Sequence, residues 1–318
     1  MLVNIFQCLN TYLQSQIIGQ PALVKQLLIA LLADGHILVQ GPPGLAKTRA
    51  VKVLSDCIEG DFHRIQFTPD LLPSDLTGSD IYRPELGDFT FQAGPIFNSI
   101  LLADEINRAP AKVQAAMLEA MAEKQITAGR QTYALPKLFL VMATQNPIEQ
   151  EGTYPLPEAQ LDRFLLQLNI DYPNEDSELE ILRLNRGEAQ GVVKQKPIHI
   201  NQESIFEARK SVLGIYMADD VEKYIIRLVM ATREPNRYSN RLTLWLDMGV
   251  SPRATLALDR CARAHAWLEG RDFVTPDDVQ TMTYPVLRHR LLLSYEAQAE
   301  GIDADSVVKH LLNQVTSV

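Results

Sequence analysis

The residues best suited to chemistry form one short stretch, Gly41-Pro42-Pro43-Gly44-Leu45-Ala46-Lys47-Thr48. An apolar segment of strand character precedes it, and a segment of helical character follows it. Glycines let the backbone turn its N–H groups toward one point, and the helix start adds the positive end of its dipole there. Lys47 can place a cation on the outer phosphates of a nucleotide, and the Thr48 hydroxyl can bind Mg²⁺. The stretch therefore predicts a triphosphate cradle, with Ala46 where the pattern G-x-x-x-x-G-K-[ST] has its second glycine.

Two other polar clusters follow apolar, strand-like segments. Asp104 and Glu105 end the run at 100–103, and Asn146 follows the run at 138–143. Phosphoryl transfer to water needs an acidic residue on the Mg²⁺ side and a group that polarises the water, and Asp104 and Glu105 suit these two roles. Taken alone, the acidic pair could be a solvated strand end, and Asn146 could be a turn residue before a proline.

These clusters converge only if their segments lie in one sheet. Strands alternate with helices between His36 and Ile170, which predicts an α/β domain with a parallel sheet covered on both faces. Ligands bind at the carboxyl ends of the strands in such sheets, and the three clusters all lie at those ends. Short alternating segments predict hairpins at 81–91 and 125–134.

The character of the chain changes after residue 173. From about Glu175 onward the pattern is helical, which indicates an all-helical domain, 174–318, beside a nucleotide-binding domain, 1–173. Asp219 and Asp220 are expected to cap one of these helices. The helices are expected at 177–187, 202–213, 219–232, 252–269, 276–287 and 305–314.

The composition is that of a soluble globular protein, with 46% hydrophobic and 22% charged residues among 318. The net charge of −9 argues against a protein that coats nucleic acid, because phosphate neutralisation needs clustered Lys and Arg. No signal peptide is visible, and the longest purely apolar run, Leu27–Ala33, is far too short for a membrane span. Cys8, Cys57 and Cys261 form no CxxC pair, which favours thiols in a reducing compartment and hence a cytoplasmic protein.

Five motifs in this order resemble the MoxR family of AAA+ ATPases, and the resemblance covers essentially the whole chain. They are Gly41–Thr48, Leu101–Pro110, Ala143–Pro147, Leu156–Phe164 and Gly249–Ala254. The resemblance implies a three-layer αβα P-loop core with family hairpin inserts, and a smaller all-helical lid domain. It also implies ATP and Mg²⁺ as cofactors. Alanine before the loop lysine is common in the family.

The resemblance also implies roles for the matching residues. Lys47 and Thr48 match Walker A, Asp104 and Glu105 match Walker B, and Asn146 matches sensor 1, which helps to orient the water. Thr48 and Asp104 are the expected residues on the metal side. The expected nucleotide contacts are Ile18, Gly19, Gly41, Pro42, Pro43, Gly44, Leu45, Ala46, Lys47, Thr48, Arg49 and Asp104.

Two arginines are expected to complete the site. Arg163 matches an arginine finger, which in this class reaches the nucleotide of the neighbouring subunit, and Arg253 matches sensor 2 in the lid. Arg108, just after Walker B, is a rival for the finger. Without the resemblance, Arg163 could be a surface ion-pair partner.

The resemblance further implies a homo-oligomer, usually a hexameric ring. Such proteins often act as chaperone-like motors that mature or activate a partner complex, with a partner protein that carries a von Willebrand factor A domain. Two alternatives stay open: a nucleotide-regulated binding module with little turnover, and a metal-chelatase-like motor subunit. The sequence does not identify the client.

Overall fold

A five-stranded parallel sheet forms the centre of the N-terminal half of the computed structural model, which describes residues 2–85, 87–129, 131–146, 152–191 and 197–316. Its strand order is β2-β5-β8-β1-β9, and every neighbouring pair is parallel. The carboxyl ends of β5, β8 and β1 therefore lie side by side at one edge. The strands are β1 (Ile37–Gln40), β2 (Phe62–Gln66), β5 (Ile100–Asp104), β8 (Leu140–Gln145) and β9 (Leu166–Asn169).

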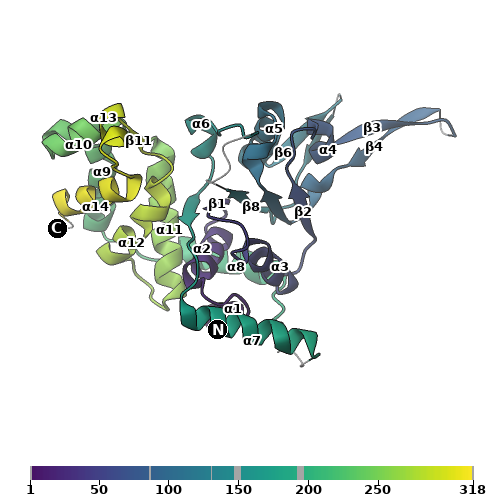
Figure 1. The fold of residues 1–318 in the computed structure, drawn as a ribbon, viewed down its shortest axis with the longest axis horizontal. Coiled ribbons are helices and arrows are strands. Elements are labelled where there is room, and N and C mark those ends of the chain that lie inside the picture. Colours follow the sequence, from purple (N-terminus) through teal and green to yellow (C-terminus); the bar gives the residue numbers. More distant parts are fainter. Residues whose placement is uncertain (1, 86, 130, 147–151, 192–196, 317–318) are drawn as a thin grey trace.

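Helices cover both faces of this sheet (Figure 1). Side chains alternate between the faces along each strand: Leu102 belongs to one hydrophobic cluster, while Leu101 and Ala103 belong to the other. The first cluster includes buried residues of α1, α2, α3 and α8, and the second includes those of α4 and α5. The predicted three-layer core is confirmed. These helices are α1 (Leu2–Gln16), α2 (Pro21–Leu32), α3 (Lys47–Asp56), α4 (Pro73–Thr77), α5 (Ala111–Glu123) and α8 (Gln202–Leu213).

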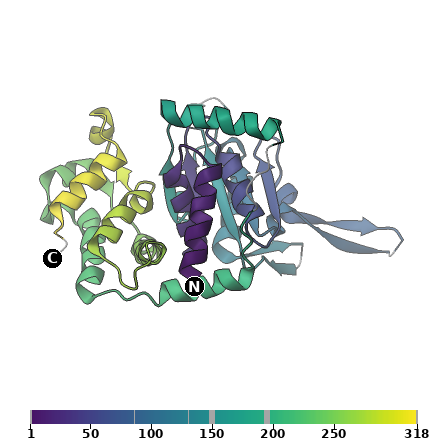
Figure 2. The same ribbon diagram turned by 90° about the horizontal axis from the view of Figure 1, so that it is seen from below.

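Two antiparallel hairpins extend the core. One of them projects far from the sheet (Figures 1 and 2). The rings of Phe91 and Tyr133 stack with their centroids 4.0 Å apart, so the two hairpins are packed together. Both predicted hairpins are confirmed, and Leu86 and Arg130 lie outside the described residues. The strands are β3 (Gly78–Arg83) with β4 (Asp88–Ala93), and β6 (Gln125–Ala128) with β7 (Gln131–Ala134).

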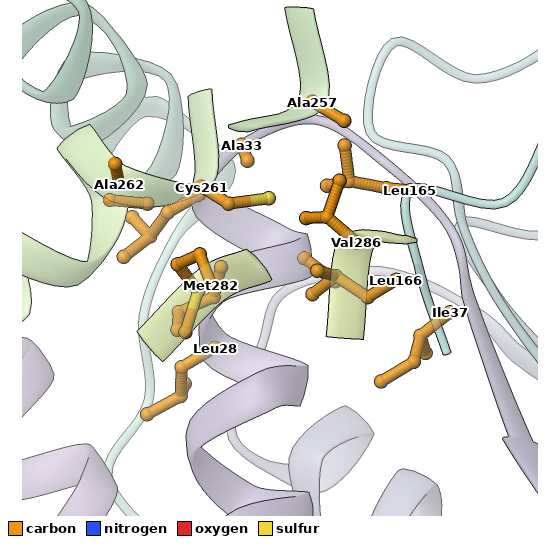
Figure 3. Packing of buried hydrophobic residues seen from close by; sticks show 14 of the residues in the cluster. Leu28, Ala33, Ile37, Leu165, Leu166, Ala257, Cys261, Ala262, Met282 and Val286 are labelled. Carbon is orange, nitrogen blue, oxygen red and sulfur yellow. The ribbon is translucent and has the colours of Figure 1, made fainter. Parts of the chain in front are cut away.

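The C-terminal half is helical apart from a small two-stranded ribbon, β10–β11, which the prediction of an all-helical domain did not include. Figure 3 shows how Cys261, Met282 and Val286 of these helices gather with Leu165 and Leu166 in one apolar cluster. The helical part is thus joined to the sheet by close packing. Its elements are α9 (Asp219–Arg233), α10 (Asn240–Trp245), β10 (Leu246–Met248), α11 (Pro252–Leu268), α12 (Pro276–Leu287), β11 (Leu292–Leu293), α13 (Tyr295–Ala299) and α14 (Ala304–Gln314).

α7 (Glu175–Ala189) and α8 lie with the N-terminal helices in both views (Figures 1 and 2). α8 contacts α1 and α2, and Ile200 just before it forms a parallel bridge with Ile58. The domain boundary near residue 173 stays a prediction. We propose that the N-terminal unit extends through α8.

α1 is a helix that the sequence-based expectations did not contain. Its buried residues Phe6, Leu9 and Leu13 recur at helical spacing, but no capping residue or proline marks its start. α9 begins after Ala218, so Asp219 and Asp220 lie in its first turn and do not cap it as expected. Both carboxylates still interact favourably there with the positive end of the helix dipole. Among the described residues, no helix has the length and apolar character needed to cross a bilayer.

Candidate nucleotide site

The phosphate loop lies between β1 and α3, as predicted. A Cβ at Gly41 would lie 2.5 Å from the carbonyl oxygen of Ile170, so only glycine fits against this strand end. Gly44 has φ of 84°, and Ala46 has φ of 57° directly before α3. A left-handed conformation costs an L-residue about 1–2 kcal/mol, which explains why related loops have glycine at this position. Lys47 Nζ donates to the carbonyl oxygen of Gly41 at 2.7 Å.

The loop and the predicted acidic residues line one cavity of about 430 Å³, which we name the loop cavity. Lys47, Thr48, Asp104, Glu105 and Asn146 all contribute to it, so the structure brings together the clusters from three strand ends. It therefore combines a cation, a hydroxyl, two carboxylates and an amide around one space. The complete lining is Pro43, Gly44, Leu45, Ala46, Lys47, Thr48, Arg49, Arg64, Gln66, Asp104, Glu105 and Asn146.

Thr144 at the end of β8 fixes the acidic pair. Its hydroxyl donates to Asp104 Oδ1 at 2.6 Å and accepts from the Glu105 backbone N–H at 2.9 Å. Thr144 is only 1% exposed, and Glu105 has φ of 57°, so this hydroxyl holds the turn that separates the two carboxylates. Sequence reasoning missed Thr144 as a site residue. Its position one strand away from Asp104 depends on the register of β5 with β8.

Two side chains of β2 also contact the acidic pair, and sequence reasoning missed both. Arg64 donates to Asp104 Oδ2 through Nη2 at 2.7 Å, and Gln66 donates to Glu105 Oε2 at 2.8 Å. Arg108 forms an ion pair with the same oxygen of Glu105, with Nε at 3.2 Å. The Glu105 carboxylate is therefore held on two sides within its own chain.

A second space of about 360 Å³, which we name the base cavity, lies on the other side of the loop residues 43–46. Ile18 lines it, as expected for an adenine contact. Gly19 has φ of 76°, and a Cβ there would lie 2.9 Å from Pro173 Cβ. Glycine at position 19 therefore allows the backbone to approach Pro173 closely at the edge of the base cavity. Sequence reasoning missed the opposite wall, which comes from the chain after β9 and from α7. That wall consists of Tyr172, Pro173, Glu178, Ile181, Leu184 and Asn185.

Arg49 lines both cavities, but its side chain is already engaged. Its Nε donates to the carbonyl oxygen of Gln16 at 2.8 Å, and its Nη2 pairs with Glu188 Oε1 at 2.6 Å. Arg49 was expected among the nucleotide contacts. In this structure it ties α3 to α1 and α7, and thereby positions the walls of the base cavity.

Arg163 and Arg253 line a separate cavity of about 420 Å³, which we name the arginine cavity. Arg163 Nη1 donates to the carbonyl oxygen of Leu118 at 2.7 Å, and its buried Nε has no hydrogen-bond partner among the described residues. Five cationic and two acidic side chains line this cavity. They are Lys124, Arg163, Arg253, Arg260, Arg290, Asp34 and Asp162.

Arg253 lies apart from the loop cavity, so its expected role there stays a prediction. As sensor 2, Arg253 was expected to complete the loop's site from the lid of the same subunit. Of the described residues, the arginines that line the loop cavity are Arg49 and Arg64. The physical reason is the packing of α11, which contacts α2 and α8 and so lies on the side of the arginine cavity.

His36 lies in the wall of the arginine cavity and is structural. Its Nδ1 accepts from the Val141 N–H at 3.1 Å, so Nε2 carries the proton and donates to the Met121 carbonyl oxygen at 3.2 Å. Burial lowers the pKa of His36 to about 4. The imidazole therefore stays neutral at physiological pH and adds no charge to the cavity.

Comparison with known proteins agrees with this geometry. Residues 36–166 match the ATPase family associated with various cellular activities (AAA), and residues 240–311 match the AAA lid domain. Chaperone MoxR1 of Mycobacterium tuberculosis is 44% identical over 94% of this chain and 78% of its own. Protein MoxR of Paracoccus denitrificans is 31% identical over 93% and 92%.

The fold comparison gives the same result. The crystal structure of a presumed ATPase from Cytophaga hutchinsonii superposes with a TM-score of 0.91 at 43% identity, covering 99% of this chain and 95% of that one. The resemblance seen in the sequence motifs is thereby confirmed. This chain belongs to the MoxR family of AAA+ ATPases.

Proposed function

We propose that this protein hydrolyses ATP at sites shared between neighbouring copies in a hexameric ring. The observation that carries the proposal is the separation of two sets of residues: the phosphate loop and acidic pair line the loop cavity, whereas Arg163 and Arg253 line the arginine cavity. Efficient phosphoryl transfer needs positive charge against the transition state. A second copy can supply it through a head-to-tail contact between the two cavities, and such a contact repeats from copy to copy to give a ring where the rotation closes.

ATP and Mg²⁺ fit the residues present. The loop and base cavities share residues 43–46, so a nucleotide can place its phosphates in one and its base in the other. The base cavity offers the apolar side chains of Ile18, Ile181 and Leu184 to a flat ring. The Thr48 hydroxyl and the Asp104 carboxylate are the hard oxygen donors that Mg²⁺ prefers. When bound, Mg²⁺ neutralises charge on the phosphates.

Each residue of the loop cavity then has one task. Lys47 leaves the Gly41 carbonyl and binds the outer phosphates, while Glu105 polarises the attacking water and Asn146 orients it. Arg163 is the arginine finger, because Arg108 is paired with Glu105 of its own chain. Arg253 lines the same cavity as Arg163, so we assign it to the neighbour's nucleotide as well.

The proposed work of the ring is chaperone-like remodelling, maturation or activation of a partner complex in the cytoplasm. The family membership and the relative named as a chaperone support this part. A partner that carries a von Willebrand factor A domain is the expected adaptor. The client can be sought by capture with the Glu105→Gln protein loaded with ATP.

A nucleotide-regulated binding module with little turnover is the second candidate. The observation that favours it is the Glu105 carboxylate, which Gln66 and Arg108 hold in place. Steady-state ATPase activity measured against protein concentration separates the two functions. Specific activity that rises as rings form supports the hydrolase, whereas turnover near zero at all concentrations supports the binding module.

A further inference from the structure

We propose that Asp162 is a positioning residue that joins Arg163 and Arg253 into one rigid unit, through a clasp formed by residues 288–290. This inference rests on the proposed function, because it concerns arginines that act on the neighbour's nucleotide. Asp162 and residues 288–290 act through these two arginines.

Asp162 is the residue directly before Arg163, and both of its carboxylate oxygens are bound by the helical domain. Arg290 Nε donates to Oδ1 at 2.9 Å, and Ser251 Oγ donates to Oδ2 at 2.8 Å. Arg253 Nη1 lies 3.8 Å from the same Oδ2. One carboxylate therefore connects residues 162–167, which we name the finger segment, to the start of α11 and to the end of α12.

The three residues after α12 bind the backbone of the same segment. Arg288 Nη1 donates to the Gln167 carbonyl oxygen at 3.0 Å, and His289 Nε2 lies 3.0 Å from that of Phe164. Arg290 Nη2 donates to the Phe164 carbonyl oxygen at 2.6 Å, and its Nη1 to that of Leu165 at 3.2 Å. We name residues 288–290 the clasp. It holds the chain from the finger into β9 at several points.

Burial makes this attachment stiff. The Arg290 side chain is only 3% exposed and that of Asp162 is 18% exposed, so their interaction is weakly screened by water. Leu165, Leu166, Met282 and Val286 pack in one apolar cluster beside the clasp (Figure 3). Any rotation of α11 and α12 must therefore carry the finger segment with it.

Charge balance gives Asp162 a second effect. The arginine cavity gathers Arg163, Arg253, Arg260 and Arg290, and like charges at this spacing repel one another. The carboxylate of Asp162 offsets this repulsion and sets the position of the group. Arg163 Nε is buried and has no hydrogen-bond partner among the described residues, so Asp162 is the carboxylate next to it in the chain.

Asp162→Asn tests the proposal, because it keeps the shape and removes the charge. We expect kcat to fall about 10- to 100-fold, the order expected for misplaced catalytic groups, while nucleotide affinity stays unchanged. Ser251→Ala removes the hydrogen bond to Asp162 and the N-cap acceptor of the Arg253 N–H, and should lower kcat by a smaller factor, about 2- to 5-fold. This milder variant keeps the test decisive if Asp162→Asn does not fold.

Asp278→Asn is the matched control. Asp278 is 1% exposed and binds Arg271 through two hydrogen bonds, at 2.6 and 2.5 Å, within the same helical domain. Within the described structure, the hydrogen bonds of the Asp278 side chain go to His265, Arg271 and Thr275, all in the helical domain. Thermal unfolding of both variants measures the stability effect. Loss of kcat in Asp162→Asn alone supports positioning, whereas equal losses at equal destabilisation contradict it.

Mixed rings give a readout that a purely structural role would not change. Asp162→Asn copies keep an intact loop cavity, and Glu105→Gln copies keep an intact arginine cavity. Their mixture should regain activity, while a mixture of Asp162→Asn with Arg163→Ala should not. If Arg163→Ala is inactive but Asp162→Asn and Ser251→Ala keep full kcat, the clasp inference is wrong and the proposed function stands. If Arg163→Ala itself keeps full activity, the proposal of a site shared between neighbouring copies is wrong.

Discussion

The loop cavity and the arginine cavity are of similar size but differ in their linings. The first, about 430 Å³, is lined by the phosphate loop, two carboxylates and three cationic side chains, and the second, about 420 Å³, is lined by five cationic side chains and two carboxylates. The carboxylates of the loop cavity are hydrogen-bonded within the chain, to Thr144, Arg64 and Gln66. In the arginine cavity the buried Arg163 Nε has no such partner among the described residues.

Under the proposed function, each cavity is half of a site. The groups assigned to nucleotide binding and water activation line one cavity of a copy, while the arginines assigned to the transition state line the other. Changes in either half should therefore impair hydrolysis for different reasons. The following variants separate those reasons.

The largest effect is expected for Arg163→Ala. The loss of an arginine finger lowers kcat by about 10³- to 10⁵-fold in well-studied systems, because transition-state charge stays uncompensated. Nucleotide affinity should not change, since Arg163 does not line the loop or base cavity. Titration with a fluorescent ATP analogue and a steady-state ATPase assay measure the two quantities. Lost affinity with unchanged kcat would contradict the comparison.

Glu105→Gln should follow, with a loss in kcat of about 10²- to 10⁴-fold. The amide keeps the size of the side chain but polarises water poorly, so ATP should bind and persist. Single-turnover hydrolysis measures the chemical step. Near-normal turnover would show that Glu105 is not the group that activates water.

Thr144→Val should lower kcat about 10-fold and cost about 1–3 kcal/mol of stability. The variant removes the donor to Asp104 Oδ1 and leaves the Glu105 N–H without its acceptor. Thr127→Val is the matched control, because Thr127 is exposed in the β6–β7 hairpin and bonds only to Thr132 in the described structure. Equal effects of the two substitutions would refute the role of Thr144.

His36 makes the wall of the arginine cavity sensitive to acid. Burial lowers the pKa of His36 to about 4, below the ordinary value of 6.5, so the unfolded chain binds the proton more tightly. The free energy of unfolding should therefore fall as the pH falls from about 6.5 toward 4, by up to about 1.4 kcal/mol per pH unit. Urea denaturation of wild type and His36→Gln between pH 7 and 4.5 measures the difference. The slope should be flatter in His36→Gln, and identical slopes would contradict the assignment.

Ala46→Gly should have the smallest effect. It relieves the left-handed conformation, at about 1 kcal/mol, but gives the unfolded chain more freedom, at about 0.4–1 kcal/mol. The two contributions nearly cancel, so stability and nucleotide affinity should change little. Gly44→Ala is the contrasting variant, because φ of 84° at Gly44 strains any side chain there. Loss of nucleotide binding in Ala46→Gly would show that the alanine methyl is needed for packing.

The sequence was sufficient for the parts of the site that lie at strand ends. The loop, Asp104, Glu105 and Asn146 were predictable because each lies at the carboxyl end of an apolar strand of one parallel sheet. Thr144 and Gln66 were missed because their contacts depend on the register between strands distant in sequence. The α7 wall was missed because its residues belong to no motif.

The sequence alone also did not predict which cavity Arg253 lines. Its motif predicts a place at the start of a lid helix, and Arg253 does lie in the first turn of α11. Which nucleotide it serves depends on the packing of that helix against α2 and α8. Such packing between domains is set by many weak apolar contacts and by no single residue type.

Mixing Arg163→Ala with Glu105→Gln tests the shared site most directly. Each variant alone should be almost inactive, since one lacks the finger and the other lacks the group that activates water. In an equal mixture about one quarter of the interfaces pair an intact loop cavity with an intact arginine cavity, if copies assemble at random. ATPase activity should therefore return on mixing. A mixture that stays inactive, in which subunit exchange is demonstrated and wild type is active, would contradict it.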